Sequence, residues 1–308
     1  EAAGAILAKS GITQGYCLIL GAGDGRLAHE LAQRSALRIV CVERDAARAA
    51  DARKRLNDAG LYGVRATVHH VEGDSLPYTT YMANLVVSED ALGGTAPSWS
   101  AEEVWRVLRP YGGMMCIGHP QGAGAGLTAA TLEAWADQGD VQGAAIDAED
   151  GLWLTARRGA APGAGEWTQL YADAGHTACS NDQLRGPMAI QWFGNPGPRE
   201  MVDRHHRPMA SLFKNGRLHI TADDKVITVD AYNGFPLWEA EVPGARRVGT
   251  MKNAGERLLT DDALYVAVDG ACRVLDPATG NQLGVIAMPR IEETLNEDAK
   301  NHEKEYGR

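Results

Sequence analysis

The stretch Gly15-Tyr-Cys-Leu-Ile-Leu-Gly-Ala-Gly-Asp-Gly25 decides the fold of the first half of the chain. Its apolar run predicts a buried strand, and the alternating glycines that follow let the backbone turn sharply and approach a bound nucleotide. Gly25 comes two positions after Gly23, whereas in the dinucleotide fingerprint G-x-G-x-x-G the third glycine comes three positions after the second. The spacing therefore disfavours an NAD site, and a helix is expected from about Leu27 to Arg34.

A second apolar strand, Leu37–Glu43, ends on an acid 43 − 21 = 22 residues after Gly21. An acceptor for ribose hydroxyls belongs at about this point of a doubly wound sheet, so Glu43 is the candidate. The run 45–59 is rich in Ala, Arg, Lys and Leu and predicts a crossover helix. Further strands are expected from residue 66, over 82–90 and over 114–118, with a short helix over 101–108, which completes an α/β domain.

Polar side chains follow each of these later strands. Asp74 and Ser75 come after the third strand, where an acid can accept a hydrogen bond from an exocyclic amine. Ser88 ends the fourth strand and is a candidate cofactor-binding residue, with Glu89 directly after it, and His119 follows the fifth strand. Because the carboxyl ends of parallel strands meet at one edge of a sheet, Glu89 and His119 are candidate general bases for a substrate bound there.

This series of motifs resembles a class I S-adenosylmethionine (SAM)-dependent methyltransferase domain over roughly residues 1–158. The motifs are the Gly-x-Gly-x-Gly loop, the acid that ends the second strand, Gly-Asp-Ser-Leu-Pro-Tyr78, Asn-Leu-Val-Val-Ser88 and Leu-Arg-Pro-Tyr-Gly-Gly113. The resemblance implies SAM as the cofactor. It places Gly21, Gly23 and Gly25 around the amino-acid part of SAM, Glu43 at the ribose, and Asp74 with Ser75 at the adenine.

The chain departs from the family pattern at two positions. The family usually carries an acid two residues before the first glycine, where this chain has Ile19, and the acid that often opens the fourth strand is Asn84. A weakened contact to the methionine amine is the expected consequence. A domain that no longer binds SAM is the alternative.

The second half of the chain contains an internal repeat. Leu212 and Leu258, Asp230 and Asp276, and Gly234 and Gly280 are each separated by 46 residues, for example 276 − 230 = 46. This is the length of a propeller blade, with short strands and one turn per unit. The repeated turn resembles that of pyrroloquinoline quinone (PQQ)-type blades, where it closes a hairpin, so bound PQQ is not expected from the repeats alone.

The repeat region is too short to close a ring. Residues 167–290 number 124, and 124/46 gives about 2.7 blades, whereas closed propellers have roughly four to eight. We therefore expect further blades from the rest of a longer chain or from a partner. The combination resembles large bacterial proteins that join a methyltransferase domain to a PQQ-type propeller. That resemblance implies export to the periplasm, whereas an active SAM enzyme is expected in the cytoplasm.

Composition narrows the classes of function. A formal net charge of −10 in 308 residues disfavours a nucleic-acid partner, since phosphate contacts need clustered Lys and Arg. No apolar stretch approaches the roughly 18 residues of a membrane span. The five cysteines show no metal-ligand spacing, so buried free thiols are expected and no metal site is predicted.

The sequence thus predicts an α/β Rossmann-like domain followed by incomplete all-β propeller blades. The expected boundaries are 1–158 for the methyltransferase-like domain, 159–165 for a linker, 166–290 for the blades and 291–308 for a charged helical tail. The expected activity is methyl transfer from SAM to a small-molecule or protein acceptor. The alternative is a non-catalytic scaffold in which a relict methyltransferase fold caps a propeller.

Overall fold

The computed structural model describes residues 1–183, 186–194, 196–200, 210–222, 224–245, 256–268 and 270–287. The chain divides into two compact units, which are described separately. The first contains Glu1–Pro162 and Gly186–Phe193, and the second contains Gly163–Arg185 and Gly194–Arg308. The tail expected over 291–308 lies outside the described residues.

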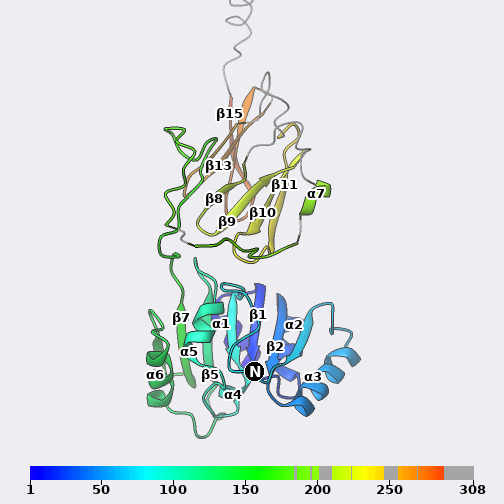
Figure 1. The fold of residues 1–308 in the computed structure, drawn as a ribbon. Coiled ribbons are helices and arrows are strands. Elements are labelled where there is room, and N and C mark those ends of the chain that lie inside the picture. Colours follow the sequence, from blue (N-terminus) through cyan, green and yellow to red (C-terminus); the bar gives the residue numbers. More distant parts are fainter. Residues whose placement is uncertain are drawn as a thin grey trace, which may run out of the picture. The chain divides into compact units, whose positions relative to one another are not determined.

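The first unit is built on one sheet (Figure 1). In residues 1–162, all of them described, seven strands are arranged in the order β3-β2-β1-β4-β5-β7-β6. The first five strands in the chain run parallel, while β7 is antiparallel to both β5 and β6. The strands are β1 Gln14–Leu20, β2 Ala36–Glu43, β3 Ala66–His70, β4 Leu85–Ser88, β5 Met114–His119, β6 Ala145–Asp147 and β7 Leu152–Arg157.

Helices cover both faces of this sheet because its central strands are apolar on both sides. In β1, Cys17 and Ile19 pack with α1, α2 and α3, while the alternate residues Leu18 and Leu20 pack in the core that also contains residues of α4, α5 and α6. The helices are α1 Ala2–Ser10, α2 Arg26–Arg34, α3 Ala46–Asp58, α4 Glu89–Leu92, α5 Ala101–Val107 and α6 Ala129–Gln138.

The doubly wound, mostly parallel sheet confirms the expected α/β architecture. The structure adds α1, α4, α6 and the antiparallel pair β6 and β7, none of which was expected. The strand expected over 82–90 is β4 only over Leu85–Ser88, because Glu89 begins α4. Among the described residues, no helix is long and apolar enough to cross a membrane. Cys17, Cys41 and Cys116 are buried free thiols in the central strands, and burial raises the pKa of each.

The described part of the second unit contains two antiparallel sheets of four strands each. Each sheet is a meander, in the orders β11-β10-β9-β8 and β12-β13-β14-β15. The first contains β8 Leu212–Lys214, β9 Arg217–Thr221, β10 Lys225–Asp230 and β11 Pro236–Glu241, and the short helix α7 Gly197–Glu200 precedes it. The second contains β12 Arg257–Leu259, β13 Leu264–Val268, β14 Ala271–Leu275 and β15 Gln282–Ala287.

The two aspartates of the sequence motif stand at matching hairpins. The carbonyl oxygen of Asp230 accepts a hydrogen bond of 2.8 Å from the backbone N–H of Gly234, and Asp276 accepts one of the same length from Gly280. The antiparallel sheets are therefore what the structure shows for this region. The propeller stays a prediction.

Equivalent positions in the two sheets differ in burial. Strand register aligns Leu212, His219, Thr228 and Trp238 across the first sheet, and the first three are at most 1% exposed. The indole N–H of Trp238 donates to the carbonyl oxygen of Pro277 at 3.1 Å, so this row faces the second sheet. The equivalent row of the second sheet, 46 residues later, is Leu258, Tyr265, Val274 and Gly284, in which Leu258 is 39% exposed.

We expect Gly280→Ala to loosen the packing of the two sheets. A Cβ on Gly280 would lie 2.5 Å from Cε3 of Trp238, and the φ of +76° strains any L side chain. Gly270 has a similar φ of +72° with nothing within 4 Å of its Cβ position, which makes Gly270→Ala the matched control. Overpacking should add about 1–3 kcal/mol to the backbone strain that both variants share. Hydrogen exchange over 271–287 should therefore accelerate more in Gly280→Ala, and equal rates in the two variants would contradict the contact.

Candidate functional site

The candidate site lies where the order of the parallel strands reverses. β2 and β3 extend the sheet on one side of β1, and β4 and β5 extend it on the other. Open α/β sheets bind ligands in the crevice at such a switch point, outside the carboxyl ends of the strands. Leu20 of β1 pairs with Ser88 of β4, so the glycine loop and Glu89 leave the sheet side by side.

The glycine loop, Gly21–Gly25, requires its three glycines for different reasons. All three have positive φ, of 78°, 50° and 80°, in the left-handed region that favours glycine. A Cβ on Gly25 would lie 3.1 Å from Cα of Ala52 in α3, so this glycine allows α3 to pack against the loop. Gly21 and Gly23 instead face carboxylates that follow β4.

Glu43 anchors the loop from the end of β2. Its carboxylate is 3% exposed, and its Oε2 accepts a hydrogen bond of 2.9 Å from the backbone N–H of Ala22. Oε1 accepts a second, also of 2.9 Å, from the N–H of Asp45, which caps α3. Each carboxylate oxygen has a further lone pair, so Glu43 can accept additional hydrogen bonds besides those from Ala22 and Asp45.

Glu89 is the acid that faces Gly23. A Cβ on Gly23 would lie 2.8 Å from Cγ and 2.9 Å from Oε1 of Glu89. The Oε2 atom of Glu89 is buried and has no hydrogen-bond partner. Burial, followed by the negative charges of Asp24 and Asp90, raises the pKa of Glu89 to about 7.

The neighbouring acids already have partners. Asp90 Oδ2 accepts hydrogen bonds from the backbone N–H of Ser98 at 3.2 Å and from its hydroxyl at 2.7 Å. Asp24 Oδ2 accepts from the guanidinium groups of Arg26 at 3.2 Å and Arg55 at 3.0 Å. In the described part of the chain, Glu89 is therefore the carboxylate of this crevice with an uncompensated oxygen. A cationic ligand such as SAM would complement the negative charge of this carboxylate.

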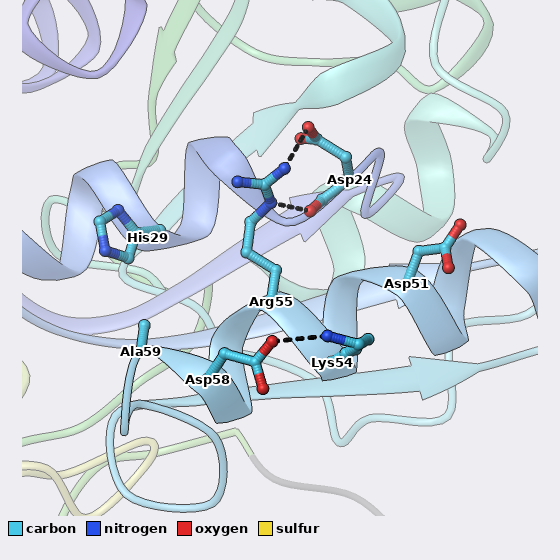
Figure 2. A pocket seen from close by; sticks show the side chains of 7 residues that line it. All are labelled: Asp24, His29, Asp51, Lys54, Arg55, Asp58 and Ala59. Atoms are coloured by element: carbon cyan, nitrogen blue, oxygen red, sulfur yellow. Dashed lines mark hydrogen bonds and ion pairs between the residues drawn. The ribbon is translucent and has the colours of Figure 1, made fainter.

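A hollow of about 630 Å³ lies beside the glycine loop, along α2 and α3 (Figure 2). Arg55 reaches from α3 to Asp24, donating to both its carbonyl oxygen and its carboxylate, while Lys54 pairs with Asp58. Asp24 and Arg55 thus fix the loop from its outer side. The sequence analysis did not single out Arg55, since nothing in the pattern of a crossover helix shows which of its basic residues faces the loop.

The residues expected at the adenine lie on an exposed loop. The side chain of Asp74 is 99% exposed, and its Oδ1 accepts a hydrogen bond of 3.1 Å from Arg44, which follows Glu43. Ser75 is also exposed. Ser88 differs, because it is 2% exposed and its hydroxyl caps α4 by accepting from the N–H of Ala91 at 3.2 Å. The structure therefore brings Asp74 near the end of β2 and gives Ser88 a capping role.

His119 ends β5 on the same edge of the sheet. Its Nδ1 lies 3.0 Å from the carbonyl oxygen of Pro120, which can only accept, so Nδ1 carries a proton. In the neutral ring Nε2 is then the acceptor, and this atom is buried without a hydrogen-bond partner. Gly124 packs directly against the ring, so the loop after β5 covers His119.

Residues 17–112 match the family model described as "Methyltransferase domain". The match places a methyltransferase domain in the first unit. No curated protein sequence matches the chain.

Several solved structures are similar to the chain. A protein of Methanococcus maripaludis described as a SAM-dependent methyltransferase is 21% identical, with 52% of this chain and 84% of that chain covered and a TM-score of 0.44. A SAM-dependent methyltransferase from Aquifex aeolicus is 14% identical, with coverage of 50% and 87% and a TM-score of 0.41. Phosphoethanolamine N-methyltransferase 2 of Haemonchus contortus, in complex with SAM, is 20% identical, with coverage of 47% and 37% and a TM-score of 0.39.

We expect Gly23→Ala to abolish SAM binding, because the added Cβ would displace Glu89 and strain the loop at a φ of +50°. Gly60→Ala is the matched control, since Gly60 has a φ of +69° and open space around its Cβ position. Calorimetric titration of SAM into each variant is the measurement. Binding of SAM to Gly23→Ala with the affinity of the parent would show that the ligand does not approach this loop.

The pKa of Glu89 also predicts how stability depends on pH. Because this pKa is raised above its ordinary value in the folded state, the folded chain keeps the proton longer than the unfolded chain. The parent therefore loses stability as the pH rises from about 4.5 to about 7. Glu89→Gln should match the parent below about pH 4, where Glu89 is protonated in both states, and exceed it by about 1–3 kcal/mol above about pH 7. Thermal unfolding across this pH range checks the difference, and a constant difference would contradict the raised pKa.

Proposed function

We propose that the first unit is an active methyltransferase that transfers a methyl group from SAM to a small-molecule or protein acceptor. The observation that carries this proposal is the uncompensated Glu89 carboxylate beside Gly23, at the switch point of the sheet. A buried carboxylate costs free energy unless it is paired, and SAM brings positive charge to that position. The match of residues 17–112 supports the same class of ligand.

The proposed cofactor residues contribute in different ways. Gly21 and Gly23 leave the space in which the amino-acid part is bound, whereas Gly25 acts through the packing of α3 against the loop. Glu43 accepts from the ribose hydroxyls while it holds the loop through Ala22. Asp74 and Ser75 accept from the adenine amine, and Ser88 acts indirectly by capping the helix that carries Glu89.

When bound, SAM supplies a methyl group made electrophilic by its sulfonium. The chain must therefore orient the acceptor, exclude water and remove a proton where the acceptor is a hydroxyl or amine. Glu89 and His119 are the candidate bases. The raised pKa of Glu89 supports proton acceptance near neutral pH, and His119 has a buried Nε2 without a hydrogen-bond partner.

For the second unit we propose that the two antiparallel sheets are blades of a propeller. The 46-residue offset between Asp230 and Asp276, and the matching hydrogen bonds of their hairpins, support this proposal. Leu258 and Tyr265 of the equivalent row in the second sheet line a hollow of about 520 Å³. Further blades, from this chain or from a partner, would cover that face as the second sheet covers the first.

We expect the full chain to bind SAM with micromolar affinity in a calorimetric titration. Glu43→Ala should weaken binding by about 1–3 kcal/mol, because a charged acceptor is lost and the loop loses its bond from Ala22. Asp51→Asn, at an exposed acid of α3 that lines the hollow along α2 and α3, is the control for the change of charge. Undetectable binding by the parent would instead favour a non-catalytic scaffold, and unchanged affinity in Glu43→Ala would place the ribose contact elsewhere.

A further inference from the structure

Glu89 stands apart from the other acids around the glycine loop. Glu43 accepts two backbone N–H bonds, Asp90 accepts from Ser98, and Asp24 pairs with Arg26 and Arg55. Glu89 has no ion pair among the described residues, and its Oε2 is both buried and without a hydrogen-bond partner. The fold therefore holds one carboxylate at the crevice whose charge is left for something else to neutralise.

The position of this carboxylate indicates which group neutralises it. Glu89 follows β4 directly, and its Cγ and Oε1 lie within 3 Å of the Cβ position of Gly23. It thus borders the part of the loop at which the amino-acid end of SAM is proposed to bind. In the strand that leads to the loop, the residue two before Gly21 is Ile19, which is 1% exposed and belongs to the apolar core. β1 therefore provides no carboxylate at this point, and β4 provides one from the neighbouring strand.

We propose that the Glu89 carboxylate binds the α-ammonium group of the methionine part of SAM. The proposal rests on the proposed function, since it assumes that SAM occupies this crevice. An ammonium group donates three hydrogen bonds and carries a full positive charge, which the uncompensated Oε2 can accept. Glu89 is on this account a cofactor-binding residue.

The groups around Glu89 make an incoming cation favourable. Asp24 and Arg26 face it from the glycine loop and the start of α2, Glu43 and Cys41 from β2, and Asp90 from α4. The acids outnumber the one arginine, and that arginine also pairs with Asp24. Binding of an ammonium at Glu89 would therefore lower the pKa of its carboxyl and release the proton that burial retains.

The test compares three probes on the full chain by calorimetry. SAM carries both the ammonium and the sulfonium, S-adenosylhomocysteine keeps only the ammonium as its positive group, and 5′-methylthioadenosine lacks the amino-acid part. Glu89→Gln keeps the size of the side chain and removes its charge. Asp58→Asn removes one charge from the hollow along α3, where Asp58 pairs with Lys54, and serves as the control.

Glu89→Gln should weaken the binding of SAM and of S-adenosylhomocysteine by the same factor, about ten- to a hundredfold, and leave the affinity for 5′-methylthioadenosine unchanged. Asp58→Asn should bind all three as the parent does. If the binding of 5′-methylthioadenosine were weakened equally, Glu89 would have a merely structural role. If only the binding of SAM were weakened, Glu89 would contact the sulfonium instead of the ammonium. Unchanged affinities would overturn the proposal outright. Failure of the parent to bind SAM would instead overturn the proposed function.

Proton release on binding is a second measurement, and a purely structural role of Glu89 would not produce it. Near about pH 6.5, titrations in buffers of different ionisation enthalpy should show that the parent releases part of a proton when SAM binds. The release should persist with S-adenosylhomocysteine and disappear in Glu89→Gln. A release that survives the substitution would assign the proton to another group and contradict the proposal.

Discussion

The carboxylate of Glu43 is the contact on which the geometry of the crevice depends. It joins the end of β2 to the glycine loop through Ala22 and to the start of α3 through Asp45. A buried carboxylate is costly unless its oxygens are hydrogen-bonded, and here each oxygen has a backbone donor. The loop is thereby held against β2, while Arg55 holds the same loop from α3 through Asp24. Gly23 is fixed from two sides before any ligand binds.

Glu43 and Glu89 each place a carboxylate oxygen out of reach of solvent, but the chain compensates the two differently. Glu43 is compensated by the chain itself, whereas Glu89 is left with an oxygen that no described group satisfies. Burial and the nearby Asp24 and Asp90 disfavour its charged form, which is why its pKa rises to about 7. Such an arrangement lowers the free energy of unfolding near neutral pH. Groups with strongly shifted pKa values are found most often at functional sites. Ligand binding and folding stability are thus linked through one side chain.

The sequence predicted the parts of the fold that arise from local patterns. Apolar runs that end in glycine or an acid located β1 and β2, and the Ala-rich run located α3, because strand and helix periodicity are properties of neighbouring residues. It did not reveal that Gly25 faces Ala52, that Ser88 caps α4, or which acid lacks a partner. These facts depend on side-chain directions set by packing between distant segments. The antiparallel strands β6 and β7 were missed although the turn dipeptide Asp150-Gly151 lies between them, because β6 has only three residues and shows no strand periodicity.

The assignment of Glu89 also limits how the chain can remove a proton from an acceptor. A carboxylate paired with the cofactor's ammonium is a poor base, since the pairing lowers its pKa and occupies its free oxygen. His119 has the complementary geometry, because the hydrogen bond from Nδ1 to Pro120 leaves the lone pair on Nε2. The register of β4 and β5, which pairs Val87 with Cys116, brings both residues to the same edge of the sheet. Under the proposed roles, Glu89 binds the cofactor, and His119 is left as the candidate base for the acceptor. An acceptor that has no proton to lose at its nucleophilic atom would need no base.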